Sequence, residues 1–207
     1  MKTTLVRAVR VRRSGAFTLL EMLVVVTIIA LLSALAAVQV NRVLIDAHAA
    51  QTLTVAMELK NGISSYQLDY NRFPLEARAV GDEDMPEFLT DGSNPMVDAL
   101  LGVPPAAGGK DLNPLRTKYV EFKPAQGDRN GIVGTDVPRR FHDRWGQPFR
   151  IVLDTNGDNQ VKNPDLASSD PKISQGKPEY LPVQVAVYSV GSDRVAHSRD
   201  DVASWRK

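Results

Sequence analysis

The sequence predicts an α+β protein in which one long N-terminal helix precedes a small β-rich head. Residues 17–40, FTLLEMLVVVTIIALLSALAAVQV, form an apolar run whose only ionisable side chain is Glu21. Residues 41–70 contain no proline and place apolar side chains at helical spacing. Short apolar or alternating segments lie between residues 118 and 190, as is typical of antiparallel strands.

The composition suits one modest domain plus an anchor and excludes several kinds of site. The net charge of the 207 residues is +1, so no overall basic field indicates nucleic-acid binding. Residues 1–16 hold five basic residues and no acidic one; of the 25 basic residues 20 then remain against 24 acidic, a balance of −4. The absence of cysteine excludes disulfides and thiolate metal sites.

The apolar run has the properties of a membrane segment. As a helix, residues 17–40 rise about 36 Å, which is enough to cross a bilayer core. The basic leader keeps residues 1–16 in the cytoplasm by the positive-inside rule. An ordinary signal peptide has a shorter apolar core followed by small residues, whereas here the small residues 14–16 precede it. A plain signal anchor leaves Glu21 unexplained, since a carboxylate inside a membrane segment is costly and usually functional.

The motif SGAFTLLEMLVVVTIIALL resembles the leader and N-terminal helix shared by type IV pilins and type II secretion pseudopilins. That family has a basic leader, a small residue, a Phe and a Glu as the fifth mature residue. The resemblance implies that a prepilin peptidase cleaves between Ala16 and Phe17 and methylates the new amine. Cleavage after Gly15 makes Glu21 the sixth residue, so we expect cleavage at Ala16, which preserves the spacing from Phe to Glu.

The same resemblance implies that the chain is a subunit of a homopolymer with other pseudopilins, built on an inner-membrane assembly platform. Glu21 then neutralises the N-terminal ammonium of a neighbouring subunit, because an unpaired charge in a low-dielectric core is far costlier than a paired one. The expected location is the bacterial inner membrane, crossed once, with the head in the periplasm and the subunit in the filament after assembly. The expected organisation is a leader at 1–16, a transmembrane helix half at 17–40, an amphipathic helix half at 41–73 and the head at 74–207.

The amphipathic half has one apolar stripe, formed by steps of four and three residues. The stripe consists of Ile45, Ala49, Thr52, Ala56, Leu59, Ile63, Tyr66 and Tyr70. Residues 71–74 end the helix, because proline disfavours helical geometry in the residue before it. The resemblance implies a pilin-like lollipop, in which this half of the helix packs against a small antiparallel sheet.

Within the head, residues 94–101 predict a short helix and three segments predict strands. The strand candidates are residues 118–123, 149–153 and 183–190. DRWGQPF, at residues 143–149, resembles a family turn that presents an aromatic side chain to the core. Trp145 is therefore expected to be a packing anchor, and a simple Gly/Pro turn between strands is the alternative.

Residues 188–205, YSVGSDRVAHSRDDVASW, resemble the calcium loop of major pseudopilins. The resemblance implies that Ca²⁺ binds to the side chains of Asp193, Asp200 and Asp201 and to the backbone carbonyls of Val190 and Ser198. The physical argument agrees, because three carboxylates on a short loop repel one another and Ca²⁺ prefers six to eight oxygen ligands. A solvated acidic segment, partly neutralised by neighbouring arginines, is the alternative.

A second acidic loop, DTNGDNQVKNPD, occupies residues 154–165. Its oxygen-bearing residues fall at positions 1, 3, 5, 7 and 12 of an EF-hand-like template. They are Asp154, Asn156, Asp158, Gln160 and Asp165. Position 6 is Asn159 instead of glycine, and no second helix follows, so the sequence predicts a turn loop with a possible second Ca²⁺ site.

The sequence shows no catalytic set, and its histidines are scattered, so we do not expect an enzyme. The main hypothesis is a structural pseudopilin of a type II secretion system, whose periplasmic filament drives export of folded proteins. The C-terminal loop and the lack of cysteine favour it over a type IV pilin, which is the first alternative. A membrane-anchored calcium-dependent binding module is the second.

Overall fold

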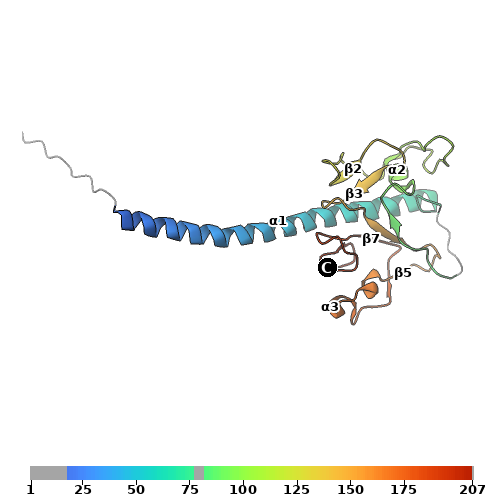
Figure 1. Ribbon diagram of the computed structural model, residues 1–207. Helices are drawn as coiled ribbons and strands as arrows, with labels where there is room; N and C mark the ends of the chain where they lie inside the picture. Colours follow the sequence, from blue (N-terminus) through green and yellow to red (C-terminus); the bar gives the residue numbers. More distant parts are fainter. Residues whose placement is uncertain (1–17, 77–81, 207) are drawn as a thin grey trace, which may run out of the picture. The chain divides into compact units, whose positions relative to one another are not determined.

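The computed structural model describes residues 18–76 and 82–206, apart from the side chains of residues 36–38 and 41. The predicted leader and the predicted cleavage site at Ala16 and Phe17 lie outside these residues. The chain divides into two compact units between Leu44 and Ile45. The helix α1 (Leu19–Tyr70) belongs to both units, and every strand of the described residues lies in the second unit, the head (Figure 1).

The start of α1 is set by a capping residue. The Thr18 hydroxyl accepts a hydrogen bond from the Glu21 amide at 3.2 Å, and the Thr-x-x-Glu spacing is that of a capping box. The described large apolar side chains from Leu19 to Leu35 are all exposed, between 42% and 85%. Within residues 18–76 and 82–206, no helix combines the length and apolarity needed to cross a bilayer.

In the head, α1 buries the middle of the predicted stripe. Thr52, Ala56, Leu59, Ile63 and Tyr66 are all buried. The predicted stripe is therefore confirmed from Thr52 to Tyr66. The helix ends at Tyr70, as predicted, and the following Asn71 has a left-handed φ of 49°.

One glycine of α1 marks a close approach to another segment. A Cβ atom at Gly62 would lie 2.3 Å from the Val120 Cγ1 atom. Only a residue without a side chain therefore allows the segment at Val120 to lie this close to the helix.

The head is built on a four-stranded antiparallel sheet in the order β1-β4-β7-β8. Its strands are β1 (Phe88–Leu89), β4 (Arg150–Leu153), β7 (Val185–Ser189) and β8 (Val202–Ala203). Two smaller sheets pair β2 (Gly131–Val133) with β3 (Arg140–His142) and β5 (Val161–Lys162) with β6 (Tyr180–Leu181). The short helices are α2 (Met96–Leu101), the 3₁₀ helix η1 (Pro164–Ala167) and α3 (Pro171–Ser174). The predicted α+β class, a helix with an antiparallel sheet, is confirmed.

The two faces of the sheet contribute to separate apolar clusters, because successive residues of a strand point to opposite faces. Ile151, Leu153, Val185 and Val187 belong to the larger cluster, which also contains the buried stripe of α1. The alternate positions on β4 and β7, Val152 and Ala186, belong to the smaller cluster with Val161 and Leu181. The β5–β6 pair therefore covers the sheet face opposite α1.

Residues 118–123 do not form the predicted strand, and that expectation is wrong. The segment bonds to the helix instead: the Tyr119 hydroxyl donates to Asp69 at 2.7 Å, and the Glu121 amide donates to Glu58 at 3.2 Å. Val120 is buried. The alternation in the sequence therefore reflects packing on α1, although the Lys123 carbonyl at the end of the segment accepts a hydrogen bond from the Ile132 amide of β2 at 2.9 Å.

Candidate functional site

Glu21, the predicted assembly residue, lies in the first turn of α1. Its side chain is exposed and has no ion-pair partner within the part of the chain that the structure describes. A carboxylate in the first turn is favoured by the positive end of the helix dipole. Glu21 therefore lies at the favourable end of the helix dipole, and its role in assembly stays a prediction.

The loop between β7 and β8 folds around Asp200. Its Oδ2 atom accepts hydrogen bonds from the Ser192 hydroxyl and the Asp193 amide, both at 2.8 Å, and its Oδ1 atom accepts one from the Ser198 hydroxyl at 2.6 Å. Burial raises the pKa of Asp200, but these hydrogen bonds outweigh it and lower the pKa to about 2. Gly191, with φ 69°, is needed because a Cβ atom there would lie 2.2 Å from the Asp200 carbonyl oxygen.

Asp201 lies buried beside Asp200. Its Oδ2 atom accepts a hydrogen bond from the His197 amide at 2.8 Å. Its Oδ1 atom is 3.3 Å from the Ser198 hydroxyl, so that hydroxyl lies between the two carboxylates. Burial raises the pKa of Asp201, while the hydrogen bonds of the loop and the charge of Arg206 oppose this increase.

The third predicted carboxylate, Asp193, is exposed and accepts a hydrogen bond from the Val195 amide at 2.8 Å. No group of three or more His, Asp or Glu side chains is arranged to hold a metal ion among the described residues. The oxygens of Asp200 and Asp201 converge on the Ser198 hydroxyl, however, and they are the hard oxygen donors that Ca²⁺ prefers. The donor chemistry fits Ca²⁺, and the full ligand set stays a prediction.

The second acidic loop is closed by its own side chains. The Asp154 carboxylate accepts hydrogen bonds from three backbone amides of residues 157–159, at 2.7–3.1 Å. Asn156 accepts one from the Asp158 amide at 3.0 Å, and Asp158 accepts one from the Gln160 amide at 2.9 Å. The loop is therefore held by consecutive side-chain-to-backbone turns.

Asp165, the last residue of that second set, contacts a cation of the chain itself. Its Oδ1 atom accepts hydrogen bonds from Arg206, at 3.0 Å from Nε and 2.7 Å from Nη2. Within η1 its amide donates to the capping residue Asn163 at 3.0 Å. The second metal site stays a prediction, while in this structure Asp165 holds Arg206.

Sequence reasoning missed the contacts that hold the C-terminal loop to the segment after η1. The Ser168 hydroxyl donates to the His197 carbonyl at 2.5 Å, and Arg199 forms an ion pair with Asp170. Both pairs are separated by 29 residues. No local pattern links residues so far apart, so neither contact had a signal in the sequence.

The turn at Asp143 did carry such a signal. Its Oδ1 atom accepts hydrogen bonds from the amides of Trp145 and Gln147, both at 2.8 Å, and the Ser189 hydroxyl donates to Oδ2. An aspartate that opens a Gly-containing turn is typical of this geometry. Trp145, which follows, is partly buried and lines a cavity of about 470 Å³ together with Asp200.

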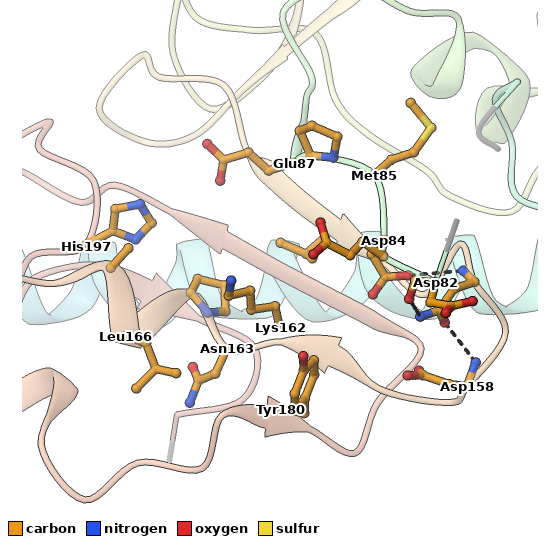
Figure 2. A pocket seen from close by; sticks show the side chains of 16 residues that line it. Asp82, Asp84, Met85, Glu87, Asp158, Lys162, Asn163, Leu166, Tyr180 and His197 are labelled. Atoms are coloured by element: carbon orange, nitrogen blue, oxygen red, sulfur yellow. Dashed lines mark hydrogen bonds between the residues drawn. The ribbon is translucent and has the colours of Figure 1, made fainter. Parts of the chain in front are cut away.

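A further pocket of about 610 Å³ has acidic side chains along its wall (Figure 2). Figure 2 shows Asp82, Asp84 and Asp158 near the loop that follows β4. Asp84 accepts hydrogen bonds from two backbone amides of that loop, at 2.7 and 3.1 Å, and Glu87 accepts one from the Tyr188 hydroxyl at 2.6 Å. Asp84 and Glu87 therefore act as structural ties between segments of the head.

Comparison with known proteins found two similarities in sequence. Residues 11–37 match the prokaryotic N-terminal methylation motif. The type II secretion system core protein G of Aeromonas hydrophila is 24% identical over 196 residues, which cover 94% of this chain and 94% of that protein. No solved structure matches the chain at a significant level.

The motif match covers the start of the chain, and the match to the relative covers almost all of it. They support a pseudopilin or type IV pilin-like subunit, which is a structural class and not a known enzyme class. The chain is therefore similar to pseudopilins both in its prepilin-type methylation motif and along nearly its full length, where it resembles a type II secretion core protein G.

Proposed function

We propose that the chain is a structural pseudopilin subunit of a type II secretion system, which polymerises into a periplasmic pseudopilus that drives export of folded proteins. The observation that carries the proposal is the combination of the methylation motif with similarity to a core protein G along 94% of the chain. The partners are other pseudopilins, a prepilin peptidase and an inner-membrane assembly platform. The architecture is compatible with this role, since the fold is a long helix with a small antiparallel sheet.

In this proposal the subunit matures by cleavage between Ala16 and Phe17 and by methylation of the new amine. The apolar segment of residues 17–40 then anchors it in the inner membrane, with the head in the periplasm because the leader is basic. The exposed apolar side chains of α1 support this, because a helix that is apolar all round requires an apolar environment.

Assembly depends on Glu21. Within a bundle of apolar helices an unpaired carboxylate is strongly disfavoured, and a neighbouring N-terminal ammonium removes that cost. Only one axial offset between two subunits brings these groups together, so the pair selects how subunits stack. The available charge of Glu21 in the described part of the chain is compatible with this role.

We further propose that the C-terminal loop holds Ca²⁺ through the carboxylates of Asp193, Asp200 and Asp201 and the carbonyls of Val190 and Ser198. The convergence of two carboxylates on the Ser198 hydroxyl supports this site. A bound ion supplies a compact divalent charge that offsets the repulsion among these carboxylates. The chain itself fixes the loop, because Gly191 and the amides of residues 193 and 197 position Asp200 and Asp201.

A filament assay in the producing bacterium tests the proposal. Glu21→Ala is expected to insert and to be cleaved but to assemble few filaments, whereas Glu21→Asp keeps the charge and should retain part of the assembly. Cleavage is measured by the mass of the extracted subunit, and assembly by the yield of sheared filaments. Normal filament yield from Glu21→Ala contradicts the proposed pairing.

A type IV pilus subunit is the second candidate, because the methylation motif at residues 11–37 is common to pilins and pseudopilins. The two functions differ in their cellular phenotype. Deletion of the gene should abolish secretion of folded proteins if the chain is a pseudopilin. Loss of surface pili with normal secretion would instead assign it to a type IV pilus.

A further inference from the structure

Three consecutive residues of the C-terminal loop are held by Ser168 and Asp170 of the head and by Arg206. The His197 carbonyl accepts a hydrogen bond from Ser168, and the Arg199 side chain pairs with Asp170. Between them, the Ser198 carbonyl accepts a hydrogen bond from Arg206 at 3.3 Å. The loop is thus attached at residues 197–199, through two backbone carbonyls and one side chain, next to the proposed calcium ligands.

Arg206 makes the central one of these attachments. Its Nη1 atom donates to the carbonyls of Ser198 and Asp201, at 3.3 and 3.1 Å. Its Nε and Nη2 atoms donate to Asp165 Oδ1, at 3.0 and 2.7 Å. One planar guanidinium therefore fixes two backbone positions of the loop while a buried carboxylate fixes the guanidinium.

We propose that Arg206, held in place by Asp165, is a positioning residue for calcium binding in the C-terminal loop. This inference rests on the calcium site proposed above. The Arg206–Asp165 pair orients the Ser198 carbonyl, which is one proposed ligand, and the backbone of Asp201, whose side chain is another. Asp165 accordingly serves as the anion that holds Arg206.

Charge and positioning predict opposite effects for the removal of Arg206. Arg206 Nη2 lies 3.9 Å from Asp201 Oδ2, so its positive charge alone repels a cation at the loop. On that basis the neutral variant Arg206→Met should bind Ca²⁺ more tightly. If Arg206 positions the ligands, the same variant should bind more weakly, because outer partners of metal ligands typically contribute about tenfold to a hundredfold in affinity.

The test is a calorimetric titration of CaCl₂ into the chelator-treated full chain in detergent. Arg206→Met is expected to weaken Ca²⁺ binding at least about tenfold. Arg206→Lys keeps the charge but not the fork of donors and should fall between Arg206→Met and the wild type. Equal or tighter binding by Arg206→Met overturns the inference.

A matched control separates positioning from general loss of stability. Arg139 pairs with Asp98 at 2.7 Å, and the side chains are 23% and 2% exposed, the same values as for Arg206 and Asp165. Arg139→Met should therefore lower the melting temperature about as much as Arg206→Met and leave the calcium affinity unchanged. Equal losses of affinity in both variants would show a merely structural role and overturn the inference.

A second readout uses Tb³⁺ as the probe ion. Trp145 lines the same cavity as Asp200, Asp201 and Arg206, so it should sensitise Tb³⁺ luminescence in the wild type and less in Arg206→Met at equal ion concentration. A wild type that binds neither Ca²⁺ nor Tb³⁺ overturns the calcium site together with this inference. If the wild type and Arg206→Met bind Ca²⁺ and Tb³⁺ with equal affinity, only the positioning role is overturned.

Discussion

The first unit and the head differ in where their side chains find partners. In the first unit, the described large apolar side chains of α1 up to Leu35 are at least 42% exposed. In the head, the same helix buries Ala56, Leu59, Ile63 and Tyr66 completely against the sheet and its loops. Within one helix, the head therefore covers the apolar side chains that it contacts, whereas those from Leu19 to Leu35 have no such cover among the described residues.

The same contrast applies to two carboxylates. Asp143 is buried in the head and accepts hydrogen bonds from two amides of its turn and from the Ser189 hydroxyl. Glu21 is exposed and has no such partner among the described side chains. A polar group that its own fold satisfies has a structural role, whereas one left unpaired in an apolar segment indicates an external partner.

The largest expected effect separates the two regions directly. Leu59→Ala should reduce the free energy of unfolding of the head by about 2–5 kcal/mol, because the side chain is fully buried. Leu32→Ala, on the exposed part of α1, should leave it unchanged. Denaturant unfolding of the full chain in detergent measures both, and equal losses would contradict the contrast.

Removal of calcium tests whether the head supplies all its own partners. A ligand that binds only the folded state adds about 2.7 kcal/mol at a hundredfold excess over its Kd. EGTA should therefore lower the melting temperature of the wild type clearly, and Asp200→Asn should reduce that response. A melting temperature that EGTA does not change would remove the metal from the account but not the filament.

Gly62→Ala tests how closely the head packs on α1. The added Cβ atom would lie 2.3 Å from Val120 Cγ1, so we expect a loss of about 1–3 kcal/mol from overpacking. Ala49→Gly changes a less buried position of the same helix and should cost only about 0.5–1 kcal/mol of helix propensity. Chemical unfolding of both variants provides the comparison, and a neutral Gly62→Ala would show that the contact is loose.

The smallest effect concerns the pH dependence of the head. Burial raises the pKa of Asp143 more than its hydrogen bonds lower it. The folded state therefore holds the proton of this carboxyl group more strongly than the unfolded state. Its contribution to stability is therefore present below the unfolded pKa of about 3.9 and is lost as the pH rises through the folded pKa.

Asp143→Asn keeps an acceptor for the turn amides and cannot ionise. As the pH falls from 7 to 4, this site should add about 1 kcal/mol or less to the free energy of unfolding of the wild type. Asp143→Asn should lack that gain. Urea midpoints at several pH values measure the difference. Parallel pH profiles of the two proteins would show that Asp143 does not titrate in this range.

Features that depend on local periodicity could be predicted from the sequence. The helical stripe from Thr52 to Tyr66 and the strands β4 and β7 follow from spacing and apolar runs, and the structure confirms them. The motif around Glu21 was recognisable because its residues lie within a few positions of one another, and the match over residues 11–37 agrees with it.

Features that depend on distant partners could not be predicted. The alternation in residues 118–123 indicated a strand, but the segment bonds to α1, about 60 residues earlier in the chain. Arg206 lies 41 residues from Asp165, and the sequence contains no signal that pairs them. The candidate calcium loop was identified from its local resemblance to the calcium loop of major pseudopilins, whereas the contacts that hold it became visible only in three dimensions.

The most direct test of the central claim is the intact mass of the subunit extracted from the bacterial membrane, with sequencing of its N-terminal peptide. The account predicts a mature chain that begins with methylated Phe17 and lacks residues 1–16. An extracted chain that still carries Met1 and its leader would contradict the account, because Glu21 would then have no N-terminal ammonium of a neighbouring subunit to neutralise.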